Sequence, residues 1–157
     1  MSEVNRSLVG IETEPFVVAV ERGAIRRFAE AIEDGNPLFS DVETARRHGY
    51  PDLVAPPTFA TSFRLPRDPP WIATLDRWRL VAGEMSFESH RPILAGMVLT
   101  CRMRLQAIED KAGRKGTMQL LYQDLEGRDE AGRLVFVARR TTVYRPADQS
   151  LTAVARP

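Results

Sequence analysis

The chain has few of the features that mark disulfide-rich, membrane-spanning or secreted proteins. Its 157 residues include one cysteine, Cys101, so no internal disulfide can form and a reducing compartment is expected. No apolar run approaches the roughly 20 residues of a membrane span. The N-terminal segment, "MSEVNRSLVG", lacks the apolar stretch of a signal peptide. We therefore expect a cytoplasmic protein with no membrane span.

An excess of charge of one sign is also missing. The 22 basic and 21 acidic residues nearly cancel, which leaves no electrostatic footprint for a nucleic-acid partner. Metal-ligand spacing is absent as well, so neither a metal nor a cofactor is expected. What is present, 43% apolar and 27% charged residues over this length, is the composition of a globular protein with one core.

The first half of the chain predicts a strand followed by short helices. Residues 16–20 are rich in β-branched side chains and predict a strand. Apolar residues at i, i+3, i+4 and i+7 predict a helix from about residue 23 to 33. Asp41 is a suitable N-cap for a short helix that ends at Gly49. Pro57 fits the first turn of a further helix that runs to about Arg64.

The second half, from Gly83 onward, predicts four long strands separated by glycines and charged turns. Five apolar residues alternate with polar ones along one of them: Leu99, Cys101, Met103, Leu105 and Ala107. This alternation is typical of a sheet with one buried face. The connections "DKAGRKG" and "DEAGR" have hairpin length, so the last three strands should form an antiparallel meander. The predicted fold class is α+β.

Four fragments of the sequence, in order, resemble those of one enzyme family. They are "FAEAIEDGNPLFSD", "TARRHGYPDLVAPPTF", "FESHRPILAGMVLT" and "GRLVFVARRTTVYR". The chain resembles the MaoC-like dehydratases and (R)-specific enoyl-CoA hydratases, in the branch of the first domain of fatty-acid-synthase dehydratases. The resemblance implies a single hot-dog fold, an antiparallel sheet wrapped around a central helix and paired into a dimer. We expect this domain at residues 12–146, after a polar segment (1–11) and before a flexible tail (147–157).

Two parts of the family's catalytic machinery are missing. The family motif is D-x-N-P-x-H-x-D, and residues 34–41 match it except that Phe39 replaces the histidine. A phenyl ring cannot take the proton that the reaction transfers. The glycine that gives its backbone N–H to the thioester carbonyl in the family aligns with Pro57, which has no N–H. No catalytic residue is therefore assigned, and an apolar ring at position 39 suits the wall of an acyl-chain pocket.

The candidate substrate-binding residues each have a structural alternative. They are Asp34, Asn36, Phe39, Pro57, Thr58 and His90. Asp34 and Asn36 equally fit local capping of the "DGNP" turn. His90 fits either a hydrogen-bonded structural role or a pocket role with Glu84, six residues earlier on the same strand, as its partner.

Other residues carry weaker signals. His48 stands at a helix end, where a cation favours the helix dipole. Tyr50, Phe59 and Phe63 are expected in the core, whereas Trp71 and Trp78 flank a proline-rich loop and fit either packing or a cap over the pocket. Arg91 and the pair Arg139 and Arg140 fit contacts with the phosphates of coenzyme A or a carrier-protein arm, and equally a solvated surface.

Three functions remain open at this point. The first is the non-catalytic partner of a catalytic MaoC-like subunit in a heteromeric 3-hydroxyacyl-thioester dehydratase or (R)-specific enoyl-CoA hydratase. The second is a stand-alone hydratase, dehydratase or hot-dog thioesterase that uses His90 or a carboxylate. The third is a module that binds acyl-CoA or acyl-carrier-protein thioesters without turnover. The expected assembly is a homodimer, or a hetero-oligomer with a catalytic MaoC-like subunit.

Overall fold

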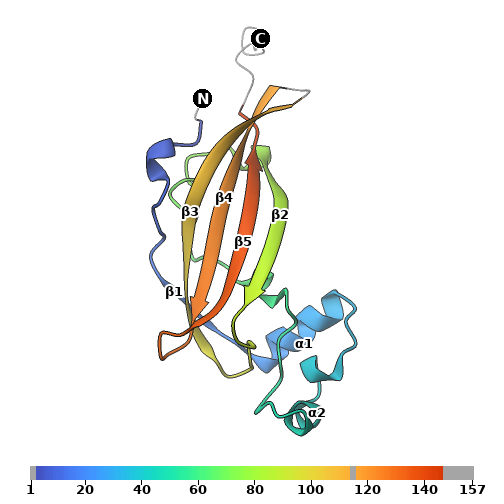
Figure 1. The fold of residues 1–157 in the computed structure, drawn as a ribbon. Helices are drawn as coiled ribbons and strands as arrows, with labels where there is room; N and C mark the ends of the chain where they lie inside the picture. The colour runs from blue at the N-terminus through green and yellow to red at the C-terminus, as the bar shows by residue number, and fades with distance from the viewer. Residues whose placement is uncertain (1–2, 114–115, 147–157) are drawn as a thin grey trace.

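The computed structural model describes residues 3–113 and 116–146, which form one five-stranded antiparallel sheet with short helices at one end (Figure 1). The strand order is β1-β3-β4-β5-β2. The strands are β1 (Phe16–Ala19), β2 (Leu80–Ser89), β3 (Val98–Gly113), β4 (Gly116–Arg128) and β5 (Leu134–Tyr144). The predicted α+β class is confirmed, and so is the meander of the last three strands. The expected tail at 147–157 lies outside the described residues.

The alternation along β3 is observed, but it changes phase after Leu105. Leu99, Cys101, Met103 and Leu105 are at most 1% exposed. The register with β4 shifts between Leu105 and Ala107, so Ile108 rather than Ala107 takes the next fully buried position. The extra residue of a β-bulge moves every later side chain to the opposite face. The prediction that Ala107 continues the buried row is therefore wrong.

Two of the three predicted helices of the first half are present, α1 (Arg22–Ala31) and α2 (Val42–Arg47). Asp41 caps α2, because its carboxylate accepts from the backbone N–H groups of Glu43 and Thr44. The hydroxyl of Thr44 also donates to Asp41, and these bonds lower the pKa of the aspartate. Gly49 follows α2 with φ +87°, the left-handed conformation that glycine adopts readily. A single 3-10 turn, η2 (Pro37–Phe39), packs between the two helices.

The central helix expected from Pro57 to about Arg64 is reduced to one 3-10 turn, η3 (Phe59–Ser62). Pro56 and Pro57 remove two backbone donors before the turn, and Phe63 after it is already extended (φ −69°, ψ 123°). The segment still occupies the place beneath the sheet, because Phe59 and Ala60 are each 2% exposed and Phe63 is 5% exposed. The sheet therefore packs over a buried turn rather than over a long helix.

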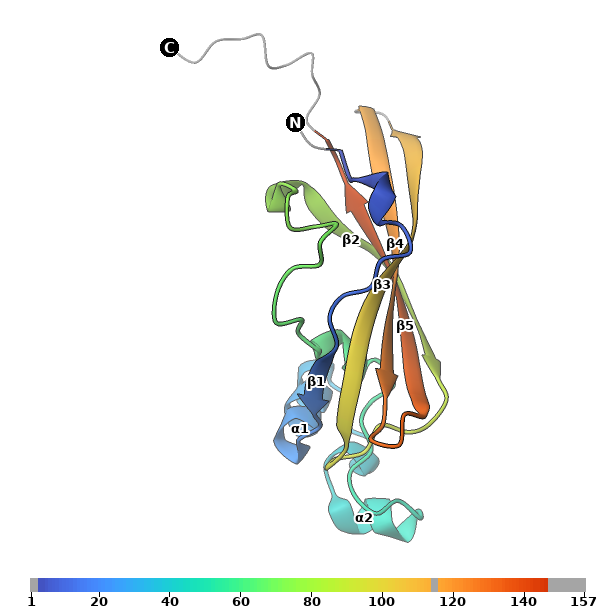
Figure 2. The ribbon, with the colours of Figure 1, turned by 90° about the vertical axis from the view of Figure 1, so that its left-hand side faces the viewer.

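The N-terminal segment follows the β3 edge of the sheet (Figure 2). Val4 is 3% exposed, and its N–H donates to the Gln119 side chain over 2.9 Å. Gly10 and Thr13 donate to backbone oxygens of β3, each over 2.8 Å. Residues 3–13 therefore continue, in irregular form, the cover that β1 gives to this edge. No strand of the described chain lies beyond β2 at the opposite edge (Figure 1).

The two tryptophans have different environments. Trp71 is 1% exposed, and its indole Nε1–H donates to Oε1 of the buried Gln123 over 2.8 Å. It is a core residue with a satisfied polar atom. Trp78 lies in the turn η4 (Arg77–Arg79) before β2 and is 97% exposed. Neither residue lines the apolar hollow described below, so of the two alternatives, packing or a cap over the pocket, packing holds for Trp71 and no cap is observed.

Candidate functional site

An apolar hollow of about 320 Å³ lies between the residues before and within η3 and the end of β2. Its apolar lining includes Ala55, Pro56, Pro57 and Ala60 from the η3 region, together with Phe87, Ile93 and Phe136. Tyr50, Glu88 and Ser89 supply its polar atoms. A mostly apolar hollow with a few polar groups is the usual form of a small-molecule site. We take this hollow, named the η3–β2 pocket, as the candidate site.

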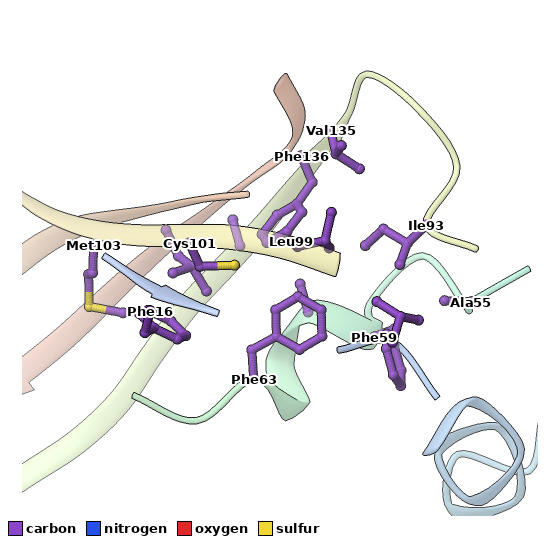
Figure 3. Packing of buried hydrophobic residues seen from close by; sticks show 14 of the residues in the cluster. Phe16, Ala55, Phe59, Phe63, Ile93, Leu99, Cys101, Met103, Val135 and Phe136 are labelled. Carbon is purple, nitrogen blue, oxygen red and sulfur yellow. The ribbon is translucent and has the colours of Figure 1, made fainter. Parts of the chain in front are cut away.

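Four phenylalanine rings pack in a run that ends at the pocket residue Phe136, and Figure 3 shows three of them, Phe59, Phe63 and Phe136. Phe28 of α1, Phe59 and Phe63 of the η3 region, and Phe136 of β5 meet edge to face, with centroid distances of 5.4, 5.5 and 5.7 Å along the run. Edge-to-face contacts of this kind add to the stabilisation from burial. The run links α1 to the sheet and fixes the ring of Phe136, which also lines the pocket.

The position of Phe136 depends on a glycine in the neighbouring strand. Gly127 of β4 stands directly opposite Phe136, and a Cβ on it would lie 2.1 Å from Cε1 of the ring. No side chain fits that space. In the sequence, Gly127 is a glycine inside a predicted strand. Such a glycine often indicates that another group lies close to the backbone, but this signal was not used in the prediction.

Of the six predicted site residues, only Pro57 lines the η3–β2 pocket. It has no N–H there to offer to a thioester carbonyl. Thr58, next to it, is exposed and outside the lining. The predicted residue that aligns with the family's donor therefore lies at the pocket and carries no N–H.

Asp34, Asn36 and Phe39 are engaged elsewhere. The Asp34 carboxylate accepts from the N–H of Asn36, and the Asn36 side chain accepts from the N–H of Leu38, each over 3.0 Å. Both residues are exposed and cap the turn. Phe39 is 6% exposed and belongs to the hydrophobic core. Its ring does not line the η3–β2 pocket, because η2 turns it into the core between α1 and α2.

His90 pairs with Glu88 and not with Glu84. Its Nε2 lies 3.1 Å from Oε1 of Glu88, whose Oε2 receives a 2.8 Å ion pair from Arg139. Six residues of extended strand span about 20 Å, so Glu84 is out of reach. The hydrogen bond and charge of Arg139 lower the pKa of Glu88. Glu88 is the pocket residue that the sequence analysis missed, although its i, i+2 spacing from His90 was a usable signal.

The predicted arginine pair is divided between the two faces of the sheet. Arg139 stands opposite Asp124 and reaches Glu88 on the outer face, whereas Arg140 stands opposite the buried Gln123 on the inner face. Adjacent strand residues point to opposite faces, so they cannot grip one ligand together. Arg91 is exposed and outside the pocket lining. His48 lies at the end of α2, with its Nδ1 2.8 Å from the carbonyl oxygen of Thr44.

A larger hollow of about 510 Å³ has a different character. It lies on the outer face of β3 and β4 and is lined mainly by charged side chains, among them Arg102, Arg104 and Glu126. Within residues 3–113 and 116–146, no group of three His, Cys, Asp or Glu residues is placed to hold a metal ion. None of the helices in these ranges is long and apolar enough to span a bilayer. Burial raises the pKa of the Cys101 thiol to about 12, which makes it unreactive.

An antiparallel sheet packed over a buried turn, with an apolar pocket beside that turn, defines a hot-dog protein. Solved structures agree. The HadBC (3R-hydroxyacyl-ACP dehydratase) complex of Mycobacterium tuberculosis matches with a TM-score of 0.70 and 25% identity, over 87% of this chain and 96% of that one. A MaoC-like dehydratase matches with a TM-score of 0.74 and 28% identity, over 91% of this chain and 44% of that one.

Sequence comparison gives the family. Residues 7–138 match the profile of the FAS1-like dehydratase domain region. A UPF0336 protein of Streptomyces coelicolor is 37% identical over 156 residues, covering 94% of this chain and 99% of the relative. A UPF0336 protein of Parafrankia is 40% identical over 126 residues, covering 76% and 82%. The chain belongs to the FAS1-like dehydratase family and has the MaoC-like hot-dog fold.

Proposed function

We propose that the protein is a cytoplasmic, non-catalytic subunit that holds the acyl part of a thioester in the η3–β2 pocket for a catalytic MaoC-like partner. The observation that carries this proposal is the chemistry of two positions. Phe39, in place of the base, is a core residue, and Pro57, in place of the donor, lines an apolar pocket. Proton transfer and stabilisation of the developing oxyanion both need groups that these residues lack.

A stand-alone enzyme has one observation in its favour, since Glu88 lines the pocket beside His90. The ion pair with Arg139 works against it. Because Arg139 stabilises the ionised carboxylate, the pKa of Glu88 is lowered and its power as a general base falls. The non-catalytic role accounts for Phe39, Pro57 and Glu88 together.

The test is a hydration assay on 2-enoyl-CoA substrates of short and long chain. We expect the protein alone to be at least about 1000-fold slower than a family member with the intact motif, because it lacks both a base and a donor. Addition of a MaoC-like subunit that carries the intact motif, from the same genome, should give turnover of the long-chain substrate. Robust turnover by the protein alone, abolished in the Glu88→Gln variant, would establish the stand-alone enzyme instead.

The partner subunit is proposed to pair with the β2 edge. Eight of the ten residues of β2 are exposed, and no strand of the described chain lies beyond it. Trp78, Val81 and Met85 add exposed apolar side chains at 97%, 48% and 36%. An open, apolar edge of this length is an association site unless it is covered. Two structural neighbours from Mycobacterium tuberculosis, HadBC and ChsH1–ChsH2, are complexes.

Lysines on the β2 edge should disrupt this pairing. In the variant Val81→Lys with Met85→Lys, charged side chains oppose the approach of another strand. Sedimentation velocity at micromolar concentration, with an equimolar amount of the subunit that carries the intact motif, should find a dimer or larger complex for the wild type and separate subunits for the variant. The matched control is Val17→Lys in β1, the opposite edge strand, where the side chain is 67% exposed. Dissociation by Val17→Lys, with no effect of the β2 variant, would place the partner at the β1 edge.

A further inference from the structure

Arg140 is a half-buried cation without an anionic partner. It lies on the inner face of β5, opposite Gln123 of β4 and Met85 of β2. Among residues 3–113 and 116–146, no carboxylate forms an ion pair with it. Three arginines on the outer face, Arg102, Arg128 and Arg139, differ from it in that each has a carboxylate within 3.5 Å. A charge removed from water without a partner is unfavourable.

The one charged side chain that shifts the pKa of Arg140 has the same sign. It belongs to Arg64, two residues after η3, which likewise has no ion pair within the described residues. Burial and the charge of Arg64 together lower the pKa of Arg140. Two like charges brought together beside the core cost free energy that a bound anion would recover.

The surroundings of Arg140 fit such an anion. It lines a hollow of about 230 Å³ between β2 and β5, together with Ala82, Met85 and Thr142. The Thr142 oxygen accepts a 2.8 Å hydrogen bond from Gln123, so its hydroxyl hydrogen remains available to donate. The lining of the hollow therefore includes a residue with a guanidinium and a residue with a hydroxyl, the kinds of group that bind phosphate oxygens.

The strands β2 and β5 line both this hollow and the η3–β2 pocket. Phe136 lines the pocket, and Arg140 follows four residues later on the same strand, about 13 Å away along the sheet. On β2, Phe87 lines the pocket and Met85 lines the hollow. The segment before η3 forms a wall of the pocket, and Arg64 follows η3. The inner face between β2 and η3 thus leads from an apolar end to a cationic end.

We propose that Arg140 and Arg64 bind the phosphate at the end of the thioester's pantetheine arm. The proposal rests on the function proposed above, in which the η3–β2 pocket holds the acyl end. The arm, with two amide units between its sulfur and its phosphate, is long enough to span the distance. Coenzyme A and carrier-protein phosphopantetheine share this phosphate, so the same site serves either source.

The test is calorimetric titration of the protein with three ligands that carry the same acyl group: decanoyl-CoA, decanoyl-phosphopantetheine and decanoyl-pantetheine. Arg140→Gln and Arg64→Gln should each weaken binding of the two phosphorylated ligands about tenfold, the typical value of a charge-assisted hydrogen bond. Binding of decanoyl-pantetheine should not change. The control is Arg104→Gln on the outer face of β3, an exposed arginine that also has no ion pair among the described residues.

The outcomes separate the two proposals. Loss only with decanoyl-CoA would assign the arginines to the nucleotide phosphates, and loss with both phosphorylated ligands to the shared phosphate. Equal loss with decanoyl-pantetheine, or the same loss in Arg104→Gln, would overturn the phosphate site while the acyl pocket stands.

If no thioester binds the wild type but inorganic pyrophosphate binds in an Arg140-dependent way, the acyl pocket fails and the anion site stands. If Arg140→Gln dissociates the subunits and leaves ligand binding intact, the cation meets a partner's carboxylate, and the phosphate site is wrong.

Discussion

Replacement of Gly127 by alanine should lower the stability of the protein by about 3 kcal/mol, the upper part of the range for overpacked cores. The added Cβ would lie 2.1 Å from Cε1 of Phe136, and the ring cannot retreat because it packs against Phe63 at a centroid distance of 5.7 Å. For a chain of this length, that loss corresponds to a decrease in Tm of roughly 10 °C. Thermal unfolding followed by circular dichroism measures it.

Two further variants identify the cause. Gly35→Ala is the matched control, because a Cβ there meets nothing within 4 Å, and its effect should stay within about 0.5 kcal/mol. Phe136→Leu removes the ring that causes the clash. The double variant Gly127→Ala with Phe136→Leu should therefore cost less than the sum of the two single changes. Strict additivity would mean that the glycine is required for another reason.

Gly127 also links stability to the proposed function. Phe136 lines the η3–β2 pocket, so a displaced ring changes the shape of the wall as well as the packing of the core. The run of rings carries that displacement toward Phe59 and Phe28, since each ring contacts the next. A change on β4 is thus expected to alter a site built mostly from η3 and β2.

The sheet was predictable from the sequence because its signal is local. The two-residue alternation along β3 and the hairpin-length turns are properties of neighbouring residues, and they gave the strands and their order in the meander. The bulge at Leu105 was not predictable, because the choice between Ala107 and Ile108 depends on the register with β4. The shortening of the expected helix to η3 has a local cause in Pro56 and Pro57, so this part of the sequence carried a signal that the prediction did not use.

The candidate site was less predictable, for a related reason. The aspartate and asparagine of the motif have local partners, so their capping role could be stated from the turn sequence. The positions of Glu88 and Arg140 depend on which face of the sheet each side chain meets. That depends on the bulge between Ala82 and Met85 and on the pairing of β2 with β5, two segments that lie far apart in the chain.

Restoring the family's two missing groups should not restore catalysis. In Phe39→His with Pro57→Gly, the new imidazole would replace a core ring that is 6% exposed, away from the pocket lining. Without a hydrogen-bond partner it would cost about 1–3 kcal/mol in stability. The Asp34 carboxylate, which should orient the water with that histidine, is exposed and already accepts from the N–H of Asn36.

We therefore expect the double variant to hydrate 2-enoyl-CoA no faster than the wild type, and to unfold at a lower temperature. Pro57→Gly alone is the control, because it returns a backbone N–H at an exposed position without placing a polar ring in the core. A steady-state assay at equal concentrations of folded protein compares the three. A clear gain of turnover in the double variant that is lost again on Asp34→Asn would show that Phe39 and Asp34 can meet at one reacting centre. In that case the wild type would lack activity because of the side chains at positions 39 and 57. The packing of η2 between α1 and α2 would not be the cause.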